Sequence, residues 1–340
     1  MSVAQIARRW ALLIVCAVVA ISAVVVSMSA PAPAAPTDAE GGNPALASAL
    51  DRASRGYTEA RAKLTASRAR QTELQKRQRI AEQRVAELGK GATTVASEAY
   101  RGSNLGALNA GLTSTSVGDY LAKSAFLDQL SHRNSEALAA LSKARAALAD
   151  EKRRIDTEVT LQQAQESLMA KRKADAERAL NSSRGNGSPE TLSGSAPRAA
   201  RGAPRRADGT FAPQGCTIDD PTSSGCLTPR ALNALQQAKA AGFTHFVACF
   251  RGASFGEHPK GRACDFAAAK TTFGGVATGA EKDYGNRLAA YFIANSDRLG
   301  VLYVIWFRRI WLPGIGWRAY TRGVGTPSSD HTNHVHLSVQ

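Results

Sequence analysis

Aromatic residues are scarce in this 340-residue sequence, at 6% of the total, and most of them lie after residue 210. Glycine and proline are almost absent from residues 45–89. With so few large apolar side chains, the first two thirds cannot form the core of a conventional globular domain. A stretch that is nearly free of glycine and proline is instead typical of a long helix. We therefore expect a helical first part and a globular last part.

The N-terminus has the order of a secretory signal. Arg8 and Arg9 precede an uncharged apolar run over residues 10–28, and small residues and proline follow up to Ala34. Residues 1–35 are therefore predicted to be a signal peptide that is cleaved after Ala34, or an uncleaved signal anchor, because the run is just long enough to span a bilayer. Both alternatives place the rest of the chain outside the cytoplasm, in the cell wall or on the outer face of the plasma membrane.

The net charge of +15 raises the question of a nucleic-acid partner. The basic residues are spread over the whole chain, and neither a zinc-finger spacing nor an aromatic-basic stacking motif is present. We therefore expect no nucleic-acid partner. An exported basic protein is better matched to an anionic wall polymer or membrane face, with a basic helical surface of no specific partner as the alternative.

The exported part has four cysteines, Cys216, Cys226, Cys249 and Cys264. In an oxidising compartment they predict two disulfides, for which three pairings exist. We favour Cys216–Cys226, which closes a short loop, and Cys249–Cys264 by elimination. Cys264 adjoins Asp265, and we interpret it as half of a bridge rather than as a metal ligand.

The helical part covers residues 45–180. Its apolar and small residues recur every seven positions, which is the pattern of a loosely packed coiled coil. The first helical stretch covers residues 45–89, and a second covers residues 126–180. The simplest arrangement of the two is an antiparallel hairpin with short helices at its tip. The first stretch has two such series: Leu46, Ala53, Ala60, Ser67, Leu74, Ala81 and Leu88, and Leu50, Tyr57, Leu64, Gln71, Gln78 and Val85.

Residues 181–215 are rich in Ser, Gly, Pro and Arg and offer almost nothing to bury, so they are predicted to be a flexible linker. Residues 216–340 form the predicted globular domain. Within it, Pro229 to Ala241 and Ala280 to Leu299 are predicted helices. Residues 244–250 are a predicted strand, and several more short strands follow the second helix up to residue 339. The expected class is an α+β domain with a small antiparallel sheet and flanking helices, behind an all-α coiled-coil hairpin.

Two stretches of this domain carry the chemistry. In the first, six residues separate His258 from Asp265, and in the second His334 and His336 lie two apart on a predicted strand and share one face. Catalytic zinc takes three protein ligands from histidine and carboxylate, with a further position open. His258, Asp265 and His336 would supply that set, and His334 could act as general base. His132 and His245 are interpreted as ordinary histidines.

Residues 256–265 together with the pair at 334–336 resemble the zinc-binding pattern of the LAS group of peptidases. That group includes lysostaphin-type endopeptidases, D-Ala-D-Ala carboxypeptidases and murein endopeptidases. The matching positions are His258, Gly261, Ala263 and Asp265, followed by the His-x-His pair. The resemblance covers about the last 95 residues and implies a zinc metallopeptidase that hydrolyses a peptide bond in peptidoglycan.

The resemblance also implies roles for neighbouring residues. The segment around Arg251 is similar to one in the carboxypeptidase branch, which implies that Arg251 positions substrate or stabilises an oxyanion. The histidines 331, 334 and 336 resemble the murein endopeptidase branch, which places His331 and His334 beside the metal. Gly256 stands where the family has serine, and Asn333 where the carboxypeptidases have a glutamate base, so the base role is expected to pass to His334.

The helical region is similar to helical regions of exported wall hydrolases and their division-associated regulators. This resemblance implies that the hairpin positions or regulates the domain and that a membrane or division-complex protein binds it. Our leading hypothesis is an exported zinc-dependent peptidase acting on peptidoglycan peptides. The alternatives are a non-catalytic protein that binds the wall or activates another hydrolase, and a purely structural stalk.

Overall fold

A computed structural model describes residues 44–102, 106–181 and 198–340. The predicted signal or anchor, residues 1–35, and most of the first half of the predicted linker lie outside the described residues. Across the described ranges, no helix combines the length and the apolar character that a membrane crossing requires.

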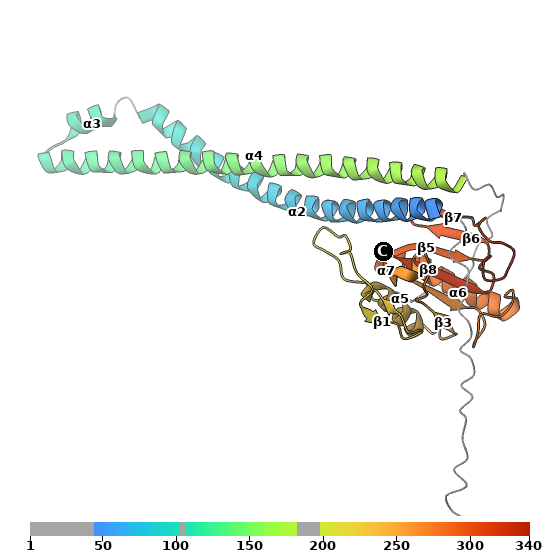
Figure 1. The fold of residues 1–340 in the computed structure, drawn as a ribbon. Helices are drawn as coiled ribbons and strands as arrows, with labels where there is room; N and C mark the ends of the chain where they lie inside the picture. Colours follow the sequence, from blue (N-terminus) through green and yellow to red (C-terminus); the bar gives the residue numbers. More distant parts are fainter. Residues whose placement is uncertain (1–43, 103–105, 182–197) are drawn as a thin grey trace, which may run out of the picture. The chain divides into compact units, whose positions relative to one another are not determined.

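Two long helices form the predicted hairpin. These are α2 (Pro44–Gly102) and α4 (Val117–Asn181), with the short α3 (Gly106–Thr113) between them, and they run alongside one another in Figure 1. Gln162 donates to Gln71 at 2.9 Å, and Arg68 forms an ion pair with Glu166 at 2.8 Å. Residues early in one helix thus meet residues late in the other, which makes the pair antiparallel, as predicted.

The heptad positions are buried near the start of α2 and become increasingly exposed farther along. Several of the later positions, Gln71, Gln78 and Ala81, are polar or small, so that part of the helix pair has less apolar surface to bury. The buried members of the two series are Leu50, Ala53, Ala60, Leu64 and Ser67. The hairpin is therefore tightly packed at its base and loosely packed toward its tip.

The C-terminal part is an α+β domain, which confirms the predicted class. Its main sheet is antiparallel, with the strand order β3-β4-β8-β5-β6-β7. The elements are β1 (Ile218–Asp219), β2 (Cys226–Leu227), α5 (Pro229–Ala240), β3 (Val247–Ala248), the 3₁₀-helix η1 (His258–Lys260), β4 (Ala263–Ala267), α6 (Gly279–Ala294), α7 (Ser296–Leu299), β5 (Val301–Trp306), β6 (Arg309–Leu312), β7 (Gly316–Ala319) and β8 (His334–Val339).

The helix boundaries follow the sequence signals with one exception. Thr228 caps α5 by accepting from the Ala231 N–H at 3.2 Å, and Gly300 ends α7 in the left-handed region at φ 69°. The predicted helix over 280–299 is instead divided at Asn295 into α6 and α7. The Asn295 side chain accepts from the Ala200 N–H at 2.7 Å and donates to the Arg198 carbonyl at 3.1 Å, so this residue ties a distant segment to the helix.

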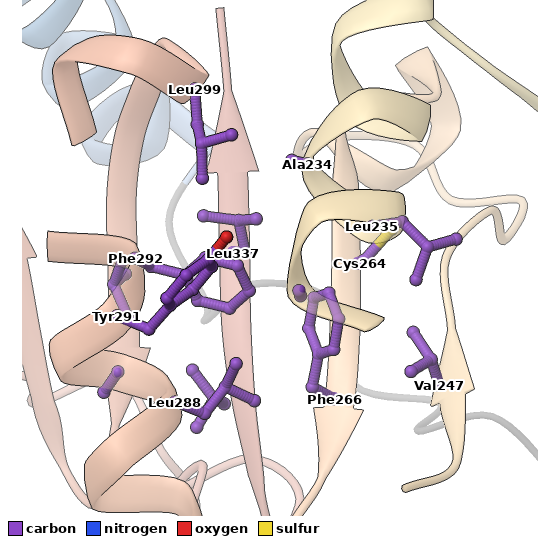
Figure 2. Close-up of a cluster of buried hydrophobic side chains, with 14 of the residues drawn as sticks. Ala234, Leu235, Val247, Cys264, Phe266, Leu288, Tyr291, Phe292, Leu299 and Leu337 are labelled. Atoms are coloured by element: carbon purple, nitrogen blue, oxygen red, sulfur yellow. The ribbon is translucent and has the colours of Figure 1, made fainter. Parts of the chain in front are cut away.

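One face of the main sheet packs against α5, α6 and α7. Figure 2 shows Leu235 of α5 above Cys264 and Phe266 of β4, with Leu288 and Phe292 of α6 beside them. All five side chains are 2% exposed or less. This apolar layer is the main core of the domain, and it leaves the opposite face of the sheet available for polar side chains.

The base of the hairpin packs on that opposite face. Leu50 and Ala53 of α2 and Ala176 of α4 share an apolar cluster with strands β5 and β6. The Ser54 hydroxyl also donates to the Leu302 carbonyl at 2.6 Å, a contact between residues 248 apart in sequence. The strand and loop members of the cluster are Leu302, Tyr303, Ile305, Ile310, Leu312 and Tyr320.

Residues 198–214, which the composition assigns to a flexible linker, are held against the domain. Besides the bonds to Asn295, the Ala203 N–H donates to the Arg298 carbonyl at 2.8 Å, and Arg205 pairs with Asp297 at 3.1 Å. Ala200 and Ala203 are buried. Hydrogen bonds of its backbone hold this stretch in place, and amino-acid composition does not reveal the partners of such bonds.

Candidate metal centre

Two of the three predicted ligands lie opposite one another on paired strands. Asp265 of β4 and His336 of β8 are direct cross-strand partners, so their side chains leave the same face of the sheet. His258 comes from η1, which lies just before β4. This is the face away from the α5–α7 layer, and all three side chains are 1% exposed or less.

The facing nitrogens of the two histidines meet the Asp265 carboxylate. His258 Nε2 lies 3.2 Å from Oδ2 of Asp265, and His336 Nδ1 lies 2.8 Å from Oδ1. The two nitrogens are 3.2 Å apart. One donor atom from each of the three residues thus lies within 4.8 Å of the others. The structure therefore brings together the three side chains that the sequence predicts as ligands.

The outer nitrogen of each histidine is held by an oxygen. His258 Nδ1 bonds the Cys249 carbonyl, and His336 Nε2 lies 2.8 Å from the Ser338 hydroxyl. Metal-binding histidines characteristically have such a partner on the second nitrogen, which orients the ring and selects its tautomer. Because the facing nitrogens converge on a carboxylate and the outer ones are satisfied, the donor set fits a zinc ion.

Disulfides brace the ligands. The bridges are Cys216–Cys226 and Cys249–Cys264, which confirms the favoured pairing. Cys249 supplies the carbonyl that His258 bonds, and Cys264 immediately precedes Asp265. The Cys249–Cys264 bridge therefore links the residue whose carbonyl orients His258 to the residue that precedes Asp265.

Arg251 also reaches the carboxylate. Its Nη1 pairs with Oδ2 of Asp265, and the arginine side chain is 14% exposed. Burial alone would raise the pKa of Asp265. His258, Arg251 and His334 face this carboxyl, however, and they hold its pKa well below the usual range. Asp265 is therefore anionic at neutral pH, which is the form that binds a cation.

His334, the predicted general base, lies beside the ligands. Its Nε2 is 3.5 Å from Oδ1 of Asp265, and its Nδ1 is 2.7 Å from the Asn333 side-chain oxygen. Because an amide oxygen only accepts, Nδ1 carries the proton and Nε2 is left able to accept one. Burial lowers the pKa of His334 to about 4, so the ring is neutral at pH 7.

His331 completes a group of three histidine rings. Its ring centroid lies 4.7 Å from that of His334 and 5.6 Å from that of His336, and the Tyr320 ring packs against it edge-on. Its backbone has φ 51°, a strained conformation for a residue with a side chain. Burial lowers the pKa of His331 well below its usual value. Backbone strain of this kind tends to cluster at functional sites.

Two positions depart from the LAS pattern that the sequence resembles, and each has a structural reason. Gly256 has φ 93°, a left-handed backbone that disfavours serine at this position. Asn333 cannot act as a base, and its amide instead donates to the Gly274 carbonyl and the Ser328 hydroxyl while its oxygen holds His334. Asn333 therefore positions the neighbouring histidine.

Two further side chains of the site, Ser338 and Tyr303, belong to neither sequence motif. Ser338 could have been found, because it follows His336 by two positions on the same strand face. Tyr303, which stacks on the His336 ring at 5.6 Å, is a cross-strand neighbour that only the strand register reveals. The two histidines interpreted as ordinary lie elsewhere: His132 is exposed on α4, and His245 stacks on Tyr284.

Comparison with known proteins gives one match. Residues 223–335 match the family model described as VldE, C-terminal domain. The matched range is about a third of the chain and includes the candidate ligands His258 and Asp265; it ends one residue before His336. None of the curated proteins and none of the solved structures matches the chain.

Proposed function

We propose that this protein is an exported zinc-dependent peptidase that hydrolyses a peptide bond in the stem or cross-bridge of peptidoglycan. The observation that carries the proposal is the buried set of His258, Asp265 and His336, each histidine with an oxygen partner on its outer nitrogen. The likeness of these positions to the LAS peptidase pattern supports the substrate class. Two disulfides are compatible with an extracytoplasmic location.

A zinc ion held by these three residues would supply a Lewis acid that polarises a peptide carbonyl and activates water. His334 would take the proton of the attacking water at Nε2 and deliver it to the leaving amine. Asn333 holds that ring in the required tautomer. Arg251, with its guanidinium at the edge of the site, would donate to the developing oxyanion.

Product analysis tests this proposal. Purified protein incubated with peptidoglycan is expected to release muropeptides whose masses identify the bond that is cut. His334→Gln should lower the rate by about 100-fold or more while leaving zinc bound, because general base catalysis contributes on that scale. Binding of the wall without any product would favour the non-catalytic alternative and overturn the proposal.

The hairpin is proposed to regulate the site by covering it. Tyr303 stacks on the candidate ligand His336 and belongs to the same apolar cluster as Leu50, Ala53 and Ala176, so the cluster that holds the base of the hairpin adjoins the metal centre. The ligands and both neighbouring histidines are 3% exposed or less. A wall peptide would need more room than this, and undocking of the hairpin would uncover that face.

Ala53→Glu tests the covering role. A carboxylate buried in the cluster should disfavour docking by more than about 1.4 kcal/mol, so muropeptide release is expected to rise about tenfold. The matched control is Ala86→Glu, an exposed position on the same helix, which should leave the rate unchanged. A fall in the rate for Ala53→Glu would instead mean that the hairpin positions a part of the site.

A further inference from the structure

A cavity whose lining includes none of the candidate metal ligands is lined by arginines. It has a volume of about 310 Å³. Its walls come from α2, from the turn at 206–214 and from the C-terminal domain. The charged lining consists of Arg55, Arg206, Arg230 and Arg262, with Glu59 as the one carboxylate side chain.

The positive charge of this cavity is only partly compensated. Asp51 and Glu257 pair with Arg55, and Glu257 also pairs with Arg262. Glu59 is itself held by Lys63 at 2.9 Å. Within the described part of the chain, no acidic side chain pairs with the other two lining residues, Arg206 and Arg230.

Arg230 is the most buried of the group, at 2% exposed. Its two Nη atoms donate to the backbone oxygens of Ala212 and Gln340, while its Nε has no hydrogen-bond partner. Nη2 of Arg55 and Nε of Arg262 also have none. Burial and the charges of Arg55, Arg205 and Arg262 lower the pKa of Arg230 to about 10. Buried guanidinium donors without acceptors are costly, and a bound anion offsets that cost.

We propose that this cavity binds a phosphate group and that the bound phosphate bridges α2 to the C-terminal domain. The guanidinium groups come from separate segments of the chain. A tetrahedral phosphate offers oxygens in several directions and suits such a set, whereas a carboxylate offers two oxygens in one plane. The cavity is larger than a single phosphate, so it has room for the polyol of a phosphate ester. This site makes no use of zinc or of peptide hydrolysis.

Titration of the purified full chain in an uncharged detergent tests this site. Inorganic phosphate and glycerol 3-phosphate are the two probes, acetate is the carboxylate control, and chloride keeps the ionic strength constant. Both probes should bind saturably and raise the unfolding temperature, and the ester should bind more tightly if the polyol is accommodated. Equal affinity for the two probes would assign the site to free phosphate alone.

Arg206→Ala is the decisive variant because Arg206 is exposed on its turn and its loss should leave the fold intact. Phosphate affinity is expected to fall about tenfold. Arg201→Ala removes an exposed arginine of the same segment outside the cavity and should leave the affinity unchanged. Absence of saturable phosphate binding, acetate binding as tightly as phosphate, or equal losses in the two variants would overturn the proposal.

Discussion

His336→Ala is expected to cost the protein its bound zinc. Wild-type protein should contain one zinc ion per chain, and the variant should bind zinc at least about 100-fold more weakly, because one of three protein ligands is missing. Muropeptide release should fall by about 1000-fold or more, since the Lewis acid contributes several kcal/mol to the reaction. Elemental analysis and competition with a chelating dye measure the first effect, and product formation measures the second.

His132→Ala is the matched control for this variant. It makes the same substitution at an exposed histidine of α4 and should keep both zinc and activity. Thermal unfolding of His336→Ala in the presence of a chelator separates a folding defect from the loss of a ligand. His258→Ala should reproduce the loss of zinc from a different element of the fold. Wild-type protein that binds no zinc, or a His336→Ala protein that retains it, would contradict the assignment of the ligands.

Replacement of Cys249 and Cys264 together by serine should lower the free energy of unfolding by about 3 kcal/mol, the value expected for a bridge across 15 residues. The same change should weaken zinc binding about tenfold to 100-fold. The reason is that the bridge connects the carbonyl that orients His258 to the backbone next to Asp265, and disturbed outer partners cost affinity on that scale. Denaturant unfolding and dye competition measure the two effects.

The other bridge provides the control. Replacement of Cys216 and Cys226 by serine opens a loop of similar size and should cost slightly less than 3 kcal/mol of stability. These residues lie against Gly261 but bond neither a ligand nor the partner of a ligand. Zinc affinity should therefore change little. Equal losses of zinc affinity in both double variants would mean that the bridges stabilise the domain without orienting the ligands.

The main features of the candidate centre were predictable because they depend on short-range order in the chain. The spacing from His258 to Asp265 and the alternation along β8 place donors on one face whenever these segments form a loop and a strand. Thr228 caps the start of α5, and Gly300 ends α7. The preferences of both residues act within one turn of helix, so a short stretch of sequence is enough to predict these boundaries.

Other features depend on partners that no local pattern specifies. The break at Asn295 arises because its amide bonds residues 198 and 200, about a hundred positions away. The same bonds order a stretch whose composition is that of a linker. The predicted strand over 244–250 is reduced to Val247–Ala248, where pairing with β4 ends.

The sequence alone determined the α+β class of the last third, the helical hairpin before it, the two disulfides and the residues that converge on one face of the sheet. The tertiary structure alone decided which nitrogen of each histidine faces Asp265 and which oxygen holds the other one. It also decided that the base of the hairpin packs on the strand next to His336. The physical reason is that propensity and spacing act over a few residues, whereas these contacts join segments up to 248 positions apart, and their energies appear only once the chain has folded.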